Sequence, residues 1–118
     1  SHNVRWWSAE ALGRLGPVAR DAVPVLEKAT GDKDDELMRI YARIALFQIV
    51  GGKQRLVEVV DMFPSSSDLA RRRGAGLLKS LGSKAAPIAP QITEIMEMEK
   101  IKSIRKDLES LSQVLATD

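Results

Sequence analysis

The sequence has no cysteine, few aromatic residues and no long apolar run. Without cysteine, the chain can form no disulfide, no thiolate metal site and no cysteine nucleophile. Aromatic residues make up 4% of the sequence, and apolar residues do not alternate at period two, so nothing in the pattern predicts β-strands. Apolar stretches such as residues 44–50 fall far short of the roughly 20 residues of a membrane-spanning helix, and no signal-peptide pattern opens the chain. We therefore expect a soluble protein outside the membrane, with the cytoplasm slightly favoured.

Residues that could support catalysis are also scarce. The single histidine is His2, which belongs to a candidate tag remnant formed by residues 1–3. The chain contains no glycine-rich phosphate loop and no HExxH-like spacing. The acids between residues 32 and 36 do not match a calcium loop, and capping and solvation explain Asp34 and Asp35 without acid or base chemistry. We expect no enzymatic activity, no cofactor and no metal.

The length and charge of the chain set further bounds. With 118 residues it fits one domain, residues 1–118, and a domain of this size buries roughly two thirds of its unfolded surface. A net charge of +2 is too small to imply a polyanion partner by itself. Because the sequence begins without methionine and enters a helical pattern at once, we expect a fragment of a longer protein. The oligomeric state is not predicted.

An internal repeat is the strongest feature of the sequence. Arg5, Arg39, Arg71 and Arg105 recur at steps of 34, 32 and 34 residues. The same shifts align sets of apolar residues: Leu12, Leu46 and Leu78; Leu15, Ile49, Leu81 and Leu115; and Ala11, Ala45, Leu77 and Leu111. A shift of 66 residues also pairs the segments between them: Gly16 with Gly82, Ala19 with Ala85, Pro24 with Pro90, and Leu26 with Ile92. Such self-similarity indicates a repeat architecture.

Each period is typical of two helices separated by helix breakers. The helices that carry the periodic arginines are expected at residues 4–15, 35–50, 68–81 and 101–116, and they alternate with helices at 19–30, 53–63 and 86–98. Asp34 or Asp35, and Ser67 or Asp68, are the candidate N-caps. Pro24 and Pro90 are expected in a first helical turn or at a kink. No breaker marks the step near Glu99.

A short pair of helices cannot bury its apolar stripe alone, but stacked pairs form a continuous core. Small residues on the arginine-bearing helices allow neighbouring layers to approach closely. The sequence therefore predicts an all-α fold of about three and a half stacked helical hairpins.

The residues that carry this pattern resemble a HEAT repeat, in particular the bacterial PBS-lyase HEAT-like repeat. Val4-Arg5 followed by residues 8–16 is similar to the second helix of the repeat, and residues 22–26, 32–35 and 37–39 are similar to the next first helix, acidic turn and second helix. The resemblance covers nearly all of residues 4–97. It departs at residues 64–68, where the paired acids are missing, and no first helix precedes residue 4. It implies a right-handed α-α superhelix, an armadillo-like α-solenoid.

The resemblance is specific for fold and weak for function, since the family includes transport receptors, phosphatase scaffolds, bilin lyase subunits and DNA-binding proteins. It implies that the arginine-bearing helices line a concave face that binds partners. The leading hypothesis is a protein–protein interaction scaffold whose partner is a protein or peptide. One alternative is binding of nucleic acid or another polyanion by the basic concave ridge. Another is an accessory subunit of a tetrapyrrole lyase.

The basic residues fall into two groups. In similar repeats the periodic arginine pairs with an aspartate of the preceding turn, which implies a structural ladder made of Arg5, Arg39, Arg71, Arg105 and Asp34. The cations outside this period are the candidates for partner binding: Arg14, Arg43, Arg72 and Arg73. Three adjacent arginines on a helix point in three directions, so at most two of them share a face. For residues 71–73, the favoured interpretation remains a solvated helix face without a binding role.

Trp6 and Trp7 cannot lie on one stripe, because neighbouring residues on a helix are about 100° apart. Trp7 aligns with Tyr41, so we expect it in the core. Trp6 aligns with Ile40 and Arg72 and is a candidate partner-binding residue, since exposed tryptophan is favoured at binding hot spots. The alternative is that Trp6 has lost a neighbour that covers it in the longer protein. If Trp6 is a hot spot, Trp6→Ala should weaken partner binding and leave the helical circular dichroism unchanged.

Overall fold

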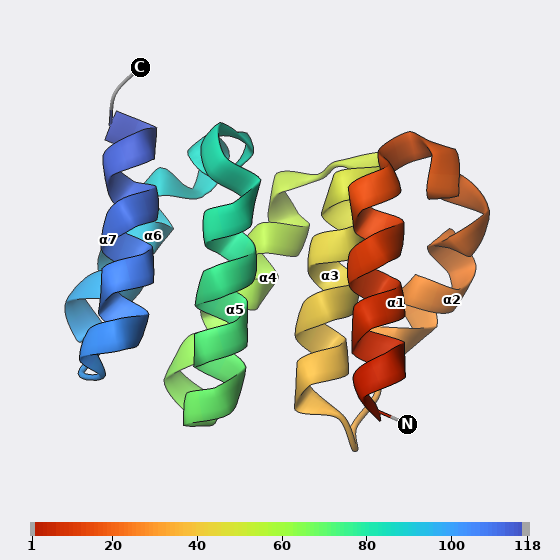
Figure 1. Ribbon diagram of the computed structural model, residues 1–118, viewed down its shortest axis with the longest axis horizontal. Helices are drawn as coiled ribbons and strands as arrows, with labels where there is room; N and C mark the ends of the chain where they lie inside the picture. Colours follow the sequence, from red (N-terminus) through yellow and green to blue (C-terminus); the bar gives the residue numbers. More distant parts are fainter. Residues whose placement is uncertain (1, 117–118) are drawn as a thin grey trace. The chain divides into compact units, whose positions relative to one another are not determined.

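The computed structural model describes residues 2–116, and these form helices joined by short turns, without a strand (Figure 1). The chain divides into two compact units, with the boundary between Val59 and Val60. Within the described residues, no helix is both long and apolar enough to cross a membrane. The prediction of an all-α fold is confirmed.

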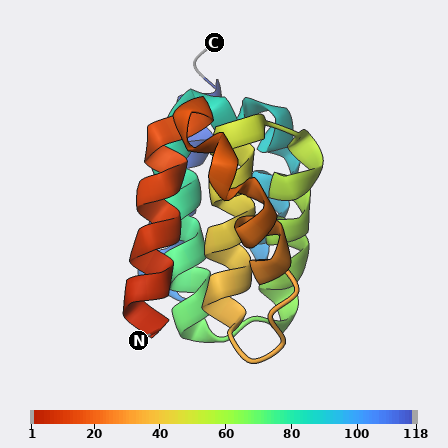
Figure 2. The ribbon, with the colours of Figure 1, turned by 90° about the vertical axis from the view of Figure 1, so that its right-hand side faces the viewer.

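The N-terminal unit is built around α3 (Glu36–Val50). Two helices pack against it: α1 (His2–Leu15) and α2 (Val23–Ala29), which are joined by the 3-10 helix η1 (Gly16–Ala22) (Figure 2). Helix α4 (Lys53–Met62) follows and crosses the boundary between the units.

The C-terminal unit repeats this arrangement around α7 (Lys102–Ala116). After the 3-10 turn η2 (Phe63–Ser65) come α5 (Asp68–Leu81), the 3-10 helix η3 (Gly82–Ile88) and α6 (Ala89–Met98). Both α5 and α6 pack against α7. The order of elements and their packing partners are those of the N-terminal unit.

The internal repeat appears as matching backbone and core positions 66 residues apart. Gly16 and Gly82 each open a 3-10 helix with a positive φ, 67° and 57°, a conformation that glycine adopts without steric cost. Residues at equivalent positions are buried in both units: Ala9 and Ala75, Ala19 and Ala85, Leu26 and Ile92, Met38 and Ile104, and Ala42 and Leu108. One three-helix motif therefore occurs twice.

The ends of the arginine-bearing helices agree with the prediction to within two residues, because the capping residues act as expected. Helices α2 and α6 begin at Val23 and Ala89, later than the predicted residues 19 and 86, because the 3-10 helices η1 and η3 precede them. The Asp35 carboxylate accepts from the Met38 amide at 3.0 Å, and Ser67 Oγ accepts from the Ala70 amide at 3.2 Å. Pro24 and Pro90 both lie in a first helical turn, where proline leaves no hydrogen bond broken.

Glu99 forms the turn between α6 and α7, where the sequence contains no helix breaker. Its backbone leaves the helical region at ψ 125°, and its carboxylate accepts from the Ile101 amide at 3.2 Å. A buried acid therefore separates α6 from α7 without glycine or proline.

The predicted core is correct for most of the aligned positions and wrong in α1. Leu46, Leu78, Ile49, Leu81, Ala45, Leu77 and Leu111 are buried, and Leu115 is half-buried. In α1, however, Leu15 is 59% exposed, Ala11 is exposed and Leu12 is half-buried. Helix α1 packs through Ala9 and Gly13 instead, because these small residues let its backbone approach α3 closely. A Cβ added at Gly13 would lie 3.0 Å from the Ala45 Cα.

Candidate partner-binding surface

Three of the four periodic arginines hold the turn that precedes their own helix. Arg39 Nη1 donates to the Asp32 carbonyl at 2.7 Å, and Arg71 Nη1 donates to the Ser66 carbonyl at 2.8 Å. Arg105 donates to the Glu99 carbonyl through Nε at 2.9 Å and Nη2 at 2.6 Å. The acceptors in these turns are backbone carbonyls, whereas the resemblance to HEAT-like repeats implied aspartate side chains. A charged donor is well suited to a carbonyl that has left the helical hydrogen-bond pattern.

Arg5 and Arg71 reach acids in the turn that precedes the next arginine-bearing helix, α3 for Arg5 and α7 for Arg71. Arg5 pairs with Asp32 at 2.9 Å and with Asp35 at 3.5 Å. Arg71 pairs with Glu99 at 2.9 Å. Asp34, the acid predicted for the ladder, is exposed, and its amide donates to the Asp32 carboxylate at 3.0 Å. The hydrogen bond from Arg5, followed by that from the Asp34 amide, holds the pKa of Asp32 below its ordinary value of 3.8.

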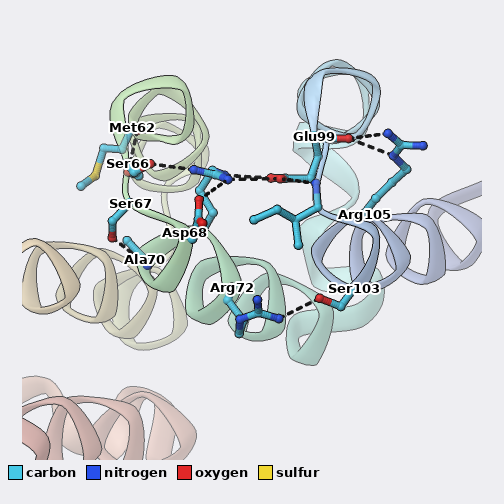
Figure 3. A network of polar contacts seen from close by, with 11 residues as sticks. Met62, Ser66, Ser67, Asp68, Ala70, Arg72, Glu99, Ser103 and Arg105 are labelled. Carbon is cyan, nitrogen blue, oxygen red and sulfur yellow. Dashed lines mark hydrogen bonds and ion pairs between the residues drawn. The ribbon is translucent and has the colours of Figure 1, made fainter.

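The cluster around Glu99 is the most buried ionic group of the C-terminal unit (Figure 3). The Glu99 side chain is 2% exposed and that of Arg71 is 20% exposed, and Arg71 Nη2 also donates to Asp68 at 2.9 Å. The hydrogen bond to Glu99 raises the pKa of Arg71, although burial opposes this effect. Both ions are fully engaged with their neighbours, so this cluster stabilises the α6–α7 turn and offers little to a ligand.

The cations outside the period lie in different environments. Arg43 has a side chain that is 19% exposed, and it contacts Glu58 at 3.3 Å and the Arg39 carbonyl at 3.2 Å. Arg14 is 71% exposed and pairs with Glu10, one helical turn away, at 2.8 Å. These two belong to the N-terminal unit, and each already has an acidic partner.

Arg72 and Arg73 lie on α5 of the C-terminal unit and are exposed. Arg72 Nη1 donates to Ser103 Oγ at 2.7 Å, which links α5 to α7 (Figure 3). Nearby on the same two helices, Lys79 contacts Asp107 at 3.4 Å and Lys106 is exposed. Within residues 2–116, neither Arg73 nor Lys106 forms an ion pair. We name Arg72, Arg73, Lys79 and Lys106 the α5–α7 basic surface.

The two tryptophans exchange their expected environments. Trp6 is half-buried, donates from Nε1 to the Asp35 carboxylate at 3.0 and 3.1 Å, and stacks on Tyr41 with ring centroids 6.2 Å apart. Trp7 is 59% exposed, so its predicted place in the core is wrong. The reason is that α1 turns Trp6, Ala9 and Gly13 towards α3, and Trp7 lies about 100° away from Trp6 on the helix.

Sequence reasoning missed the two buried acids, Asp35 and Glu99, each 5% exposed. Asp35 was expected only as a cap, and the structure adds Trp6 and Arg5 as partners. The available signal was an acidic residue between two apolar helical stripes, at a point where the chain must turn.

Among the described residues, no three His, Cys, Asp or Glu side chains gather as they would around a metal ion. No family model matches the chain, and neither a curated protein nor a solved structure matches it. Its function must therefore be inferred from the contacts and charges of its own side chains.

Proposed function

We propose that this chain is a protein-interaction module of stacked HEAT-like hairpins. The three-helix motif that recurs with the same buried positions supports a stacked-repeat core. In a right-handed superhelix of such hairpins, α1, α3, α5 and α7 would line the concave side. The module then acts as a scaffold that presents this side to a protein partner.

The observation that carries the proposal is the set of available cations on the α5–α7 basic surface. Arg72 uses one nitrogen to hold Ser103 and leaves further donors free for a partner, and Arg73 forms no ion pair within residues 2–116. Arginine is enriched at interface hot spots because its planar fork binds carboxylates in a bidentate manner. The chemistry of this surface therefore fits an acidic segment of a partner protein.

The surface is also open for docking. Gly76 is one turn beyond Arg72 on α5, and a Cβ added there would meet nothing within 4 Å. Acidic residues accompany the cations, including Asp107 beside Lys79 and the 72% exposed Asp68. This mixture of charges favours a protein partner over a uniform polyanion.

A charge-reversal experiment tests the proposal. The double variant Arg72→Glu and Arg73→Glu is compared with Arg20→Glu and Lys84→Glu, which changes the net charge equally at two exposed cations elsewhere. The intact chain serves as bait, and captured proteins are quantified by mass spectrometry after chemical cross-linking. We expect the captured amount of a set of proteins to fall at least 10-fold with the first variant. The control variant should capture the same proteins as the unmodified chain.

A third variant separates shape from charge. Gly76→Gln adds a neutral side chain beside Arg72 in open space, so the fold should be unaffected while docking is obstructed. Loss of the same captured proteins would support the α5–α7 basic surface. Equal capture by all variants would refute it.

Nucleic-acid binding is the second candidate, and exposed Arg72 and Arg73 are the observation that favours it. The two functions differ in their dependence on ionic strength, because binding to nucleic acid releases counterions.

A further inference from the structure

The N-terminal unit carries an apolar groove that its own residues leave open. It lies between α1 and α2 and has a volume of about 570 Å³. Its apolar lining includes Val4, Leu12, Val25, Leu26, Ala29 and Met38. Val4 is 57% exposed and Val25 is 72% exposed. An apolar concavity with exposed aliphatic side chains is typical of a binding groove.

The internal repeat provides a counterpart for this groove in the C-terminal unit. A shift of 66 residues places Leu26 on Ile92, Ala29 on Ile95 and Arg5 on Arg71. Ile95 and Arg71 line a smaller cavity of about 220 Å³, and Phe63 and Pro64 line it with them. Phe63 is 3% exposed. In the C-terminal unit, an aromatic residue and a proline just beyond the end of α4 therefore form one wall of the equivalent cavity.

We propose that the α1–α2 groove binds the C-terminal turn of an amphipathic α-helix that ends in a bulky apolar side chain. The segment Val60–Pro64 is the template for this partner, since it spans the end of α4 and its Phe63 lines one cavity with Ile95 and Arg71. Binding covers Val4 and Val25, which are the counterparts of Ala70 and Gln91. The inference goes beyond the proposed function because it uses another surface and apolar chemistry.

Charge at the groove fits this orientation of the helix. Arg5, Asp32 and Lys28 line the groove. Arg5 pairs with Asp32 at 2.9 Å, whereas Lys28 is exposed and forms no ion pair within residues 2–116. The C-terminus of a helix carries a partial negative charge, which nearby cations stabilise. The partner helix therefore enters with its last turn towards Lys28.

A synthetic peptide tests the proposal directly. The peptide comprises residues 53–67 of this chain with a fluorescein label, and it is titrated with the intact chain while its fluorescence anisotropy is recorded. We expect saturable binding in the micromolar range, about −8 kcal/mol by the standard conversion. A peptide with Phe63→Ala should bind at least 10-fold more weakly.

Two variants of the intact chain locate the peptide. Val25→Glu places a charge in the groove at a 72% exposed position, and Val114→Glu is the control at a 47% exposed apolar position on α7. We expect only Val25→Glu to weaken binding, by at least 10-fold, with circular dichroism unchanged in both. Equal affinity of the two variants, or no binding at millimolar concentration, would overturn the proposal.

Measurement of the oligomeric state tests whether a second copy of this chain occupies the groove. If sedimentation velocity shows a dimer that Val25→Glu dissociates, a second copy of this chain occupies the groove and the helical-partner proposal is wrong. A monomer that binds the peptide supports it. Neither result depends on the α5–α7 basic surface, so the failure of one proposal leaves the other in place.

Discussion

Two buried acids organise the turns of this molecule, and each receives an arginine. Asp35 joins Arg5, Trp6 and the start of α3, and Glu99 joins Arg71 and the start of α7. Burial of a carboxylate is costly unless charged or amide donors surround it. Each acid therefore ties a turn to a helix that lies about 30 residues earlier in the sequence.

Glu99→Ala should lower the free energy of unfolding by about 2 kcal/mol, because it leaves the Arg71 guanidinium partly buried without its main partner. Urea denaturation followed by circular dichroism measures the effect. Asp68→Ala is the matched control, since Asp68 binds the same arginine but is 72% exposed, and its loss should cost less than about 1 kcal/mol. Equal losses in the two variants would contradict the role given to Glu99.

Trp6→Ala should lower the free energy of unfolding by about 3 kcal/mol, because it removes the stacking on Tyr41 and a donor to Asp35. Trp7→Ala should change it by less than about 1 kcal/mol, since Trp7 is 59% exposed. Urea denaturation monitored by circular dichroism compares them. If Trp6→Ala destabilises the fold, weaker partner binding by this variant could result from unfolding as well as from loss of a contact with the partner. The sequence alone did not predict this structural role of Trp6.

Ionisation of Asp32 makes the stability of the N-terminal unit depend on pH in the acidic range. Because its folded-state pKa lies below 3.8, its contribution to stability is present above about pH 4 and is lost as pH falls through the lowered pKa. Asp32→Asn should therefore lose less stability than the unmodified chain between about pH 5 and pH 2. Urea midpoints from tryptophan fluorescence measure this, since both tryptophans lie in the N-terminal unit. Parallel acid profiles would contradict the assignment.

At the scale of the helices, the sequence predicted where elements begin and end much better than which way they face. Breakers such as Gly51-Gly52 and caps such as Ser67 act locally, so their effect can be recognised without knowing the fold. The face that α1 turns towards α3 depends on how closely the two helices approach. This distance cannot be predicted from the sequence of α1 alone. For the same reason, the pairing of Trp6 with Asp35 was not predicted, although both residues were noted.

Two glycines test this account of helix packing. Gly13→Ala should destabilise the chain by about 1–3 kcal/mol, since its Cβ would lie 3.0 Å from the Ala45 Cα and overlap the Gln48 side chain. Gly76→Ala should stabilise it by about 0.5–1 kcal/mol, because alanine favours the helix and the added Cβ meets nothing within 4 Å. Thermal unfolding followed by circular dichroism distinguishes the two, and shifts of the same sign would contradict the packing of α1 on α3.

Across the whole chain, positive and negative charges are nearly balanced. The net charge is +2, and the two units carry equal numbers of basic residues and equal numbers of acidic residues. Long-range attraction of a polyanion is therefore weak, and screening limits it further beyond about 8 Å at physiological ionic strength. Affinity for nucleic acid would therefore depend on local contacts, and the α5–α7 basic surface is the candidate site for them.

Chromatography on heparin tests this conclusion about charge. The four cations of the α5–α7 basic surface include Lys79, which already contacts Asp107, so about three can neutralise phosphates or sulfates. Three such contacts give a slope of about −3 for log K against log salt concentration, and binding this weak should be lost near 0.2 M NaCl. We therefore expect elution at or below that concentration, with Arg72→Glu and Arg73→Glu eluting earlier still. Retention above about 0.5 M would require many more contacts and would favour nucleic acid over an acidic protein as the partner.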